Sequence, residues 1–126
     1  MERLLLRWSR GFYTTAERTS QAIQCLGGFL CFDVGGSVDS WREWVNDPES
    51  RSVSSNYSGL EKHGDKITIQ FEYDWFHETP GAPVFELTLA QMNYILDRWQ
   101  EALEKKPNKI IITKDDSGEI KVEFED

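Results

Sequence analysis

The segment from Val84 to Lys106 constrains the fold most, because it reads as one amphipathic helix with clear ends. Thr88 can cap its N-terminus, and Gln91 lies three residues later, as a capping box requires. Six apolar residues then recur at helical spacing: Met92, Ile95, Leu96, Trp99, Ala102 and Leu103. The closing lysines suit the negative end of the helix dipole, and Pro107 ends the helix. A face this apolar must be covered by a sheet or by another helix.

Segments on both sides of this helix alternate between apolar and polar residues, as strands do. Residues 109–113 and 119–124 predict a C-terminal hairpin, with Asp115-Asp116-Ser117-Gly118 as its tight turn. Before the helix, Lys66–Tyr73 is the clearest strand. Residues 74–83 contain proline and glycine and read as a loop, and residues 84–86 extend as a short strand.

The first half of the chain gives weaker patterns. Residues 1–10 fit either a strand or a short helix. We expect a helix that starts at Thr14 or Thr15 and ends at Gly27-Gly28, then a short strand over Phe29–Val34. Residues 37–46 are predicted as a helix that stops before Asp47-Pro48. Residues 49–58 read as an exposed loop or an edge strand, and residues 61–65 as a turn.

These elements predict the fold class α+β, with an antiparallel sheet and helices packed on one of its faces. The chain has 126 residues, so we expect a single domain over residues 1–126. No apolar run approaches the length of a membrane span. The run Leu4–Leu6 is too short for a signal peptide, so a cytoplasmic protein without membrane contact is expected.

The net charge of −8 is unevenly distributed. Residues 72–104 carry seven acids against Arg98, and residues 115–126 carry six acids against Lys121. Acidic surfaces repel phosphates, which argues against direct nucleic-acid binding. They either attract a basic partner or keep the protein in solution.

No pattern of reactive or metal-binding residues stands out. Cys25, Cys31, His63 and His77 are the metal-ligand candidates, but two cysteines separated by five residues without a second close pair are a poor zinc signature. Burial makes a thiol inert, so Cys31 is not expected to act as a nucleophile. The glycine pairs lack a phosphate-binding motif. We therefore predict no catalytic residue, no metal and no cofactor.

Aromatic residues beside acids are more informative, because protein-binding hot spots have this composition. The segment 74–78 reads Asp-Trp-Phe-His-Glu, and residues 39–47 place three acids beside Trp44. In the alternative interpretation, Trp75 or Phe76 fills the end of the sheet. The predicted partner-binding residues are Asp74, Trp75, His77, Glu78, Asp39, Glu43, Trp44 and Asp47.

The second half of the chain also resembles immunity proteins of contact-dependent growth inhibition and related polymorphic toxin systems. The resemblance lies in ITIQFEYDWF (67–76), FELTLAQMNYILDRWQEALE (85–104) and KIIITKDDSGEIKVEFED (109–126). In order along the chain, these three segments are predicted to form a strand and loop, a capped helix that contains a tryptophan, and a hairpin. The resemblance implies a cytoplasmic protein that binds the C-terminal toxin domain of a cognate effector. We expect the protein itself to be a monomer or a weak homodimer. Many such toxins are nucleases, and an acidic surface would speed association with their basic clefts.

Two other classes of function compete with this one. A small hydrolase-like enzyme that used Cys31 or His77 would place that side chain in a concave pocket with a perturbed pKa. An adaptor subunit of a stable oligomer would expose a large apolar face as a monomer.

Overall fold

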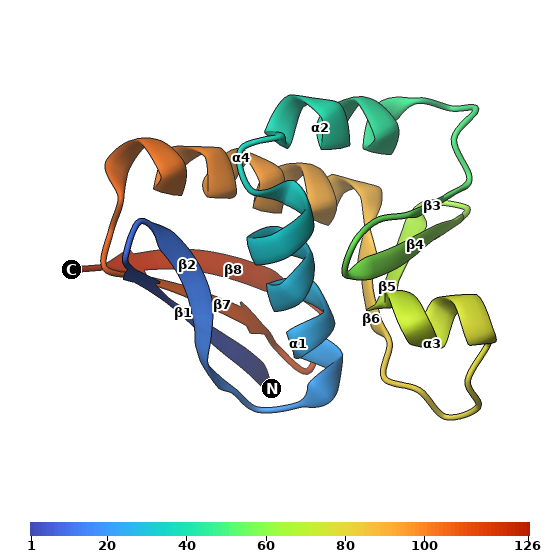
Figure 1. Cartoon of the computed structure of the whole chain (residues 1–126), viewed down its shortest axis with the longest axis horizontal. Coiled ribbons are helices and arrows are strands. Elements are labelled where there is room, and N and C mark those ends of the chain that lie inside the picture. Colours follow the sequence, from blue (N-terminus) through green and yellow to red (C-terminus); the bar gives the residue numbers. More distant parts are fainter.

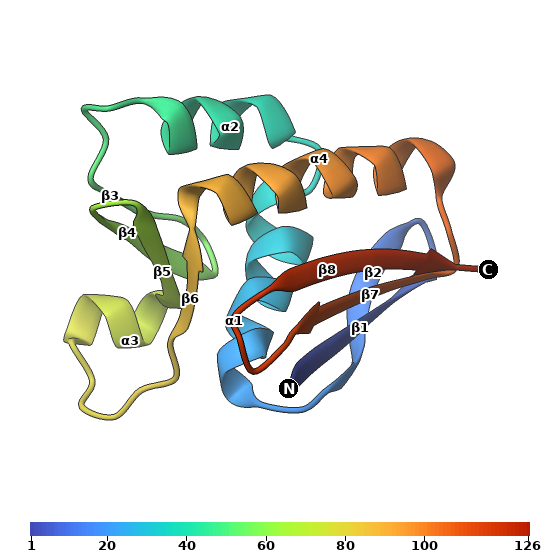
Figure 2. The same ribbon diagram turned by 180° about the vertical axis from the view of Figure 1, so that it is seen from behind.

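The computed structural model describes all 126 residues and contains two four-stranded antiparallel sheets (Figures 1 and 2). The first sheet has the order β2-β1-β7-β8, with β1 (Glu2–Ser9), β2 (Phe12–Arg18), β7 (Lys109–Lys114) and β8 (Ile120–Glu125). The second has the order β3-β4-β5-β6, with β3 (Ser52–Ser54), β4 (Ser58–His63), β5 (Lys66–Phe71) and β6 (Phe85–Thr88). The expected α+β class is confirmed, but the strands divide between two sheets where one was expected.

Four α-helices and one π-helix complete the fold. They are α1 (Gln21–Gly28), the π-helix η1 (Phe29–Val34), α2 (Val38–Asn46), α3 (Glu72–His77) and α4 (Leu89–Lys105). The helices α1 and α4 lie over the first sheet (Figure 1), and α2 packs on α4. Side chains from both sheets and from these helices form one hydrophobic core of 26 buried residues. None of the helices is both long and apolar enough to cross a membrane.

Helix α4 forms as its sequence predicts. The Thr88 hydroxyl accepts a hydrogen bond from the Gln91 backbone N–H, and the Gln91 side chain accepts one from the Thr88 backbone N–H, both at 3.0 Å. The buried residues are Met92, Ile95, Leu96, Trp99 and Ala102. Two side chains of α4 also cover the free edge of β8. The Tyr94 hydroxyl accepts from the Val122 N–H at 3.0 Å, and the Arg98 guanidinium donates to the Val122 carbonyl at 2.9 Å.

The predicted helix from Thr14 or Thr15 to Leu26 is wrong in its first half. Residues 12–18 form β2 instead, because Arg10 and Gly11 adopt positive φ values of 58° and 91° and turn the chain back onto β1. The β-branched Thr14 and Thr15 suit a strand. Helix α1 begins only at Gln21, where the Ser20 hydroxyl accepts a hydrogen bond from the Ile23 N–H at 3.2 Å.

The predicted strand over Phe29–Val34 is also wrong. The chain continues from α1 directly into η1, so the glycine pair at 27–28 lies inside helical structure and does not end it. These glycines serve close packing. A Cβ atom at Gly28 would overlap the ring of Tyr57, and one at Gly27 would lie 3.2 Å from a methyl carbon of Leu4. The helix over residues 37–46 is confirmed as α2, with Val38, Trp41 and Val45 buried.

Residues 72–77 form the short helix α3, where a continued strand and then a loop were predicted. The strand β5 ends at Phe71, and the helix ends at Glu78, which adopts the left-handed conformation with φ 49°. The charges suit a helix: Glu72 and Asp74 lie in its first turn and His77 in its last. Residues 52–54 form the edge strand β3, one of the two alternatives left open for that segment.

Candidate protein-binding surface

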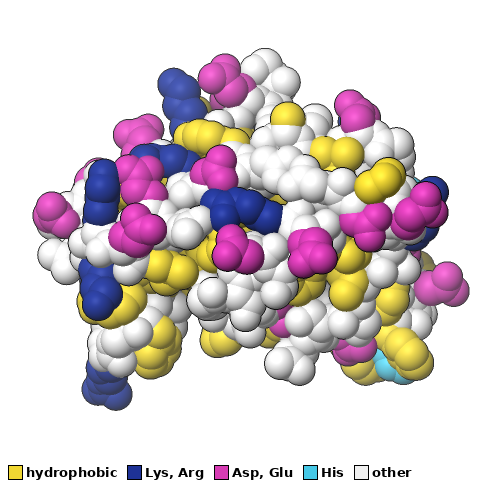
Figure 3. Space-filling model, turned by 90° about the horizontal axis from the view of Figure 1, so that it is seen from above, with side chains coloured by type: hydrophobic (Ala, Val, Ile, Leu, Met, Phe, Trp, Pro, Cys, Tyr) yellow, Lys and Arg dark blue, Asp and Glu magenta, His cyan; other side chains and the backbone are white.

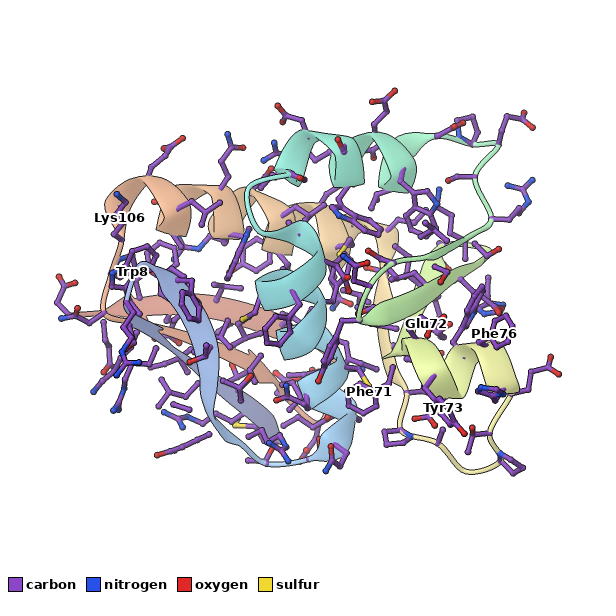
Figure 4. All side chains as sticks on the ribbon, viewed as in Figure 1. Trp8, Phe71, Glu72, Tyr73, Phe76 and Lys106 are labelled. Atoms are coloured by element: carbon purple, nitrogen blue, oxygen red, sulfur yellow. The ribbon has the colours of Figure 1, made fainter.

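Helix α3 presents two large aromatic side chains to solvent. The side chains of Tyr73 and Phe76 are 67% and 69% exposed, and Figure 4 shows both projecting from α3. The ring of His77 contacts both, tilted against Tyr73 with the centroids 4.2 Å apart and edge-on to Phe76 with the centroids 5.2 Å apart. These three residues follow the spacing i, i+3, i+4 and therefore share one face of the helix. We call them the α3 aromatic surface.

Three carboxylates accompany the α3 aromatic surface. Glu72 and Asp74 are half-buried and Glu78 is exposed. The Glu72 carboxylate accepts a hydrogen bond from the Ser54 hydroxyl at 3.4 Å. None of the three forms an ion pair with a lysine, an arginine or a histidine. The surface therefore combines exposed aromatic rings with negative charge that no internal cation neutralises.

Trp75 points in the other direction and fixes α3 to the second sheet. Its indole N–H donates to the Glu61 carboxylate at 2.8 Å, and the ring lies against Gly59 of β4. A Cβ atom at Gly59 would overlap this indole, so only glycine leaves room for it. Trp75 therefore packs on β4 of the second sheet, whereas the alternative interpretation of this segment placed Trp75 or Phe76 at the end of the sheet. This contact orients the exposed face of α3.

Sequence reasoning selected Asp74, Trp75, His77 and Glu78 but missed Tyr73 and Phe76 as exposed residues. Tyr73 was predicted as the last residue of the strand Lys66–Tyr73, because the apolar alternation of β5 continues through it. If residues 72–77 had been predicted as a helix, helical spacing would have placed Trp75 on a different face from Tyr73 and Phe76. The missing signal is the position of the strand end, which depends on packing against β4.

The second predicted group lies on and after α2. Asp39, Glu43 and Asp47 are exposed there, whereas Trp44 is half-buried. The Trp44 ring lies 4.8 Å from the Lys62 ammonium, and the Trp41 ring is its aromatic neighbour at 6.2 Å. This aromatic side chain is therefore engaged within the protein.

The charges of this second group are partly balanced. The Arg42 guanidinium pairs with Asp39 at 3.1 Å and with Asp97 of α4 at 2.7 Å. Figure 3, which looks down on α2 and α4, shows acidic and basic side chains side by side on this face. Figures 1 and 2 both place α2 and α3 on different sides of the second sheet, so the two predicted groups do not form one surface.

Neither cysteine has the properties of a nucleophile. Both are free, Cys25 is fully buried and Cys31 is half-buried. Burial raises the pKa of each thiol to about 12, so both are protonated at neutral pH. No group of three or more His, Cys, Asp or Glu side chains is arranged to hold a metal ion.

A hollow of about 560 Å³ is lined by neither a cysteine nor a histidine, whereas the protonated Cys31 thiol is among the groups that line a second hollow of about 370 Å³. The first hollow lies beside Asp47, Arg51 and Lys62. The Lys62 ammonium donates to the carbonyls of Trp44 and Asp47 at 2.8 and 2.9 Å and also to the Ser50 hydroxyl. Desolvation lowers the pKa of Lys62. With its donors engaged by the chain itself, this lysine joins the end of α2 to β4.

The buried thiol of Cys25 predicts a loss of stability at alkaline pH. An unfolded thiol ionises near pH 9, whereas the folded one keeps its proton until about pH 12, so the unfolded state binds fewer protons between these values. The free energy of unfolding should be flat below pH 9 and then fall by about 1.4 kcal/mol per pH unit for this group.

Urea titrations from pH 7 to 11 measure this decline. The Cys25→Ala variant, although less stable at pH 7, should show a shallower decline above pH 9. Equal slopes for the two proteins would contradict the assignment. Cys31, whose pKa burial also raises from 9.0 to about 12, should contribute to the decline above pH 9 in both proteins. Tyr13, whose pKa burial raises from 10.0 to about 12, should add to it above pH 10 in both.

Comparisons with protein families, with characterised proteins and with solved structures gave no match to this chain.

Proposed function

We propose that this chain is an immunity protein of a polymorphic toxin system, and that it neutralises a cognate toxin domain by binding it through the α3 aromatic surface. The observation that carries this proposal is the pairing of exposed Tyr73 and Phe76 with carboxylates that have no internal cation. A few residues supply most of the binding energy in protein interfaces, and large aromatic side chains are enriched in these interfaces. Surplus negative charge selects a partner with a basic surface.

The construction of α3 supports this assignment. An exposed aromatic pair costs solubility, and here a dedicated contact between Trp75 and Gly59 keeps it in place. Rigid presentation lowers the entropy lost on binding. The chain itself, at a net charge of −8, is repelled by nucleic acid but attracted to a protein that binds nucleic acid.

In this proposal the protein acts in the cytoplasm by binding and performs no catalysis. The partner is the C-terminal domain of the toxin, which is a nuclease with a basic cleft. The α3 surface covers this cleft or the rim beside it, while α2 and its partly balanced charges remain outside the interface. One copy of the chain suffices for one toxin domain.

A growth assay tests the proposal. A toxin domain encoded beside this chain is expressed in a bacterium from an inducible promoter, with the chain expressed from a second plasmid. Growth should be restored by the wild-type chain, and less by Glu78→Lys, which reverses a charge beside the exposed rings. The matched variant Glu43→Lys, on α2, should protect as well as wild type. Equal protection by both variants would exclude the α3 surface, and no protection by the wild-type chain would exclude the proposed function.

A further inference from the structure

A half-open aromatic pocket of about 370 Å³ lies where the β1–β2 hairpin meets the C-terminal end of α4. Figure 4 shows Trp8 and Lys106, which both line it, at the opposite end of the molecule from α3. Its volume falls within the range of small-molecule sites. The pocket takes no part in the proposed toxin-binding surface.

Four aromatic side chains form the walls of this pocket: Trp8, Phe12, Tyr13 and Trp99. The Tyr13 ring is 4.9 Å from that of Trp8 in an edge-on arrangement and 5.6 Å from that of Trp99. Tyr13 and Trp99 are 3% and 4% exposed, so the protein interior holds their rings in place. Walls of this kind favour a flat aromatic guest, which packs edge-to-face or offset against them.

The polar atoms of these walls are already used within the protein. The Tyr13 hydroxyl donates to the Pro107 carbonyl at 2.6 Å, and the Trp99 indole N–H donates to the Gly35 carbonyl at 2.8 Å. A guest therefore meets ring faces and edges, with no need to compete for these hydrogen bonds.

Lys106 is the only charged side chain that lines the pocket. No hydrogen bond or ion pair of the structure involves its ammonium group, although the protein carries a net charge of −8. An unpaired cation beside an apolar hollow free of carboxylates is complementary to a guest that carries one negative charge.

Glycines keep the mouth of the pocket open. Gly11, Gly35 and Gly36 line it, and a Cβ atom at any of them would meet no atom within 4 Å. Gly11 and Gly35 have positive φ values that favour glycine in any case. Gly36 has no such conformation, so a larger side chain there would fill the mouth without backbone strain.

We propose that this pocket binds a small planar aromatic anion, such as an aromatic carboxylate or sulfonate, with its ring among the aromatic walls and its charge at Lys106. Ring stacking supplies the affinity, and the ammonium selects the anion over a neutral molecule of the same shape.

The dye 1-anilinonaphthalene-8-sulfonate, which has two aromatic ring systems and one sulfonate, is a suitable probe, and N-phenyl-1-naphthylamine is its uncharged counterpart. Titration of the ¹⁵N-labelled protein follows the five tryptophan indole signals. The chemical shifts of the Trp8 and Trp99 indole signals should change with added dye until they reach a plateau. Those of Trp41, Trp44 and Trp75 should not change. No saturable shift, or equal shifts of all five signals, would overturn the proposal.

Two variants, checked for folding by their amide spectra, test the two halves of the proposal. Gly36→Phe should abolish the shift. Lys106 has a left-handed backbone with φ 52°, which asparagine tolerates. Lys106→Asn should weaken binding of the sulfonate by about three- to fivefold and leave binding of the neutral counterpart unchanged. Lys105→Gln, the neighbouring lysine outside the pocket, is the matched control. If Lys105→Gln weakened sulfonate binding as much as Lys106→Asn does, the loss would be due to the change in net charge. That result would overturn the role of Lys106.

Discussion

Replacement of Phe29 by alanine should lower the free energy of unfolding by about 3–5 kcal/mol. This phenylalanine is fully buried at the start of η1, and its ring packs edge-on against Trp41 of α2 at 4.8 Å. The substitution removes a large apolar group and leaves a cavity between helices that are held from several sides. A domain of this size has about 5–15 kcal/mol of total stability, so this single substitution should remove a large fraction of it.

Phe32→Ala provides the matched control, because it makes the same chemical change three residues later in the same π-helix. The Phe32 side chain is 55% exposed and contacts Tyr57 with ring centroids 5.0 Å apart. Loss of the Phe32 ring should lower the free energy of unfolding by less than about 1 kcal/mol. Urea unfolding followed by tryptophan fluorescence measures both values. Similar losses for the two variants would mean that η1 is not oriented as described, with Phe29 inside and Phe32 outside.

The elements that the sequence predicted well are those whose signals are local. Helix α4 has its cap, its apolar face and its closing proline within one segment. The hairpin β7–β8 has two alternating strands around a turn, in which the Asp115 carboxylate accepts a hydrogen bond from the Ser117 N–H at 3.0 Å. Every interaction that defines these elements joins residues close in sequence, so periodicity and turn chemistry suffice.

The elements that the sequence predicted poorly depend on contacts with residues far away in the chain. Residues 29–34 are apolar enough for a strand or a buried helix, and periodicity cannot separate the two in so short a run. Residues 29–34 form a helix because of the way α1 and η1 pack against the two sheets. The glycine pair at 27–28 misled the prediction for a related reason, because its role is close contact with Leu4 and Tyr57 and not helix termination.

The candidate site was located only in part for the same reason. The composition of residues 72–78 indicated a binding segment, and the structure places exposed aromatic residues and unpaired carboxylates there. The direction of each side chain depended on whether the segment was a loop or a helix. That choice is made by the Trp75 contact with Gly59, sixteen residues earlier in the chain, which no local pattern indicates.

The second large effect should be on binding to the toxin. The double variant Tyr73→Ala/Phe76→Ala removes both exposed rings of α3, and hot-spot residues of this type each contribute about 2 kcal/mol or more. Affinity should therefore fall at least about 30-fold, and by much more if the two effects add. Stability should change little, because neither side chain is buried.

Isothermal titration calorimetry with an inactivated form of the toxin domain encoded beside this chain tests the central claim most directly. The wild-type protein should bind tightly and Tyr73→Ala/Phe76→Ala at least about 30-fold more weakly. The matched double variant Phe12→Ala/Phe32→Ala removes two rings that are each 55% exposed away from α3, and it should bind as wild type does. Unchanged affinity in the α3 variant, or an equal loss in the matched variant, would contradict the account.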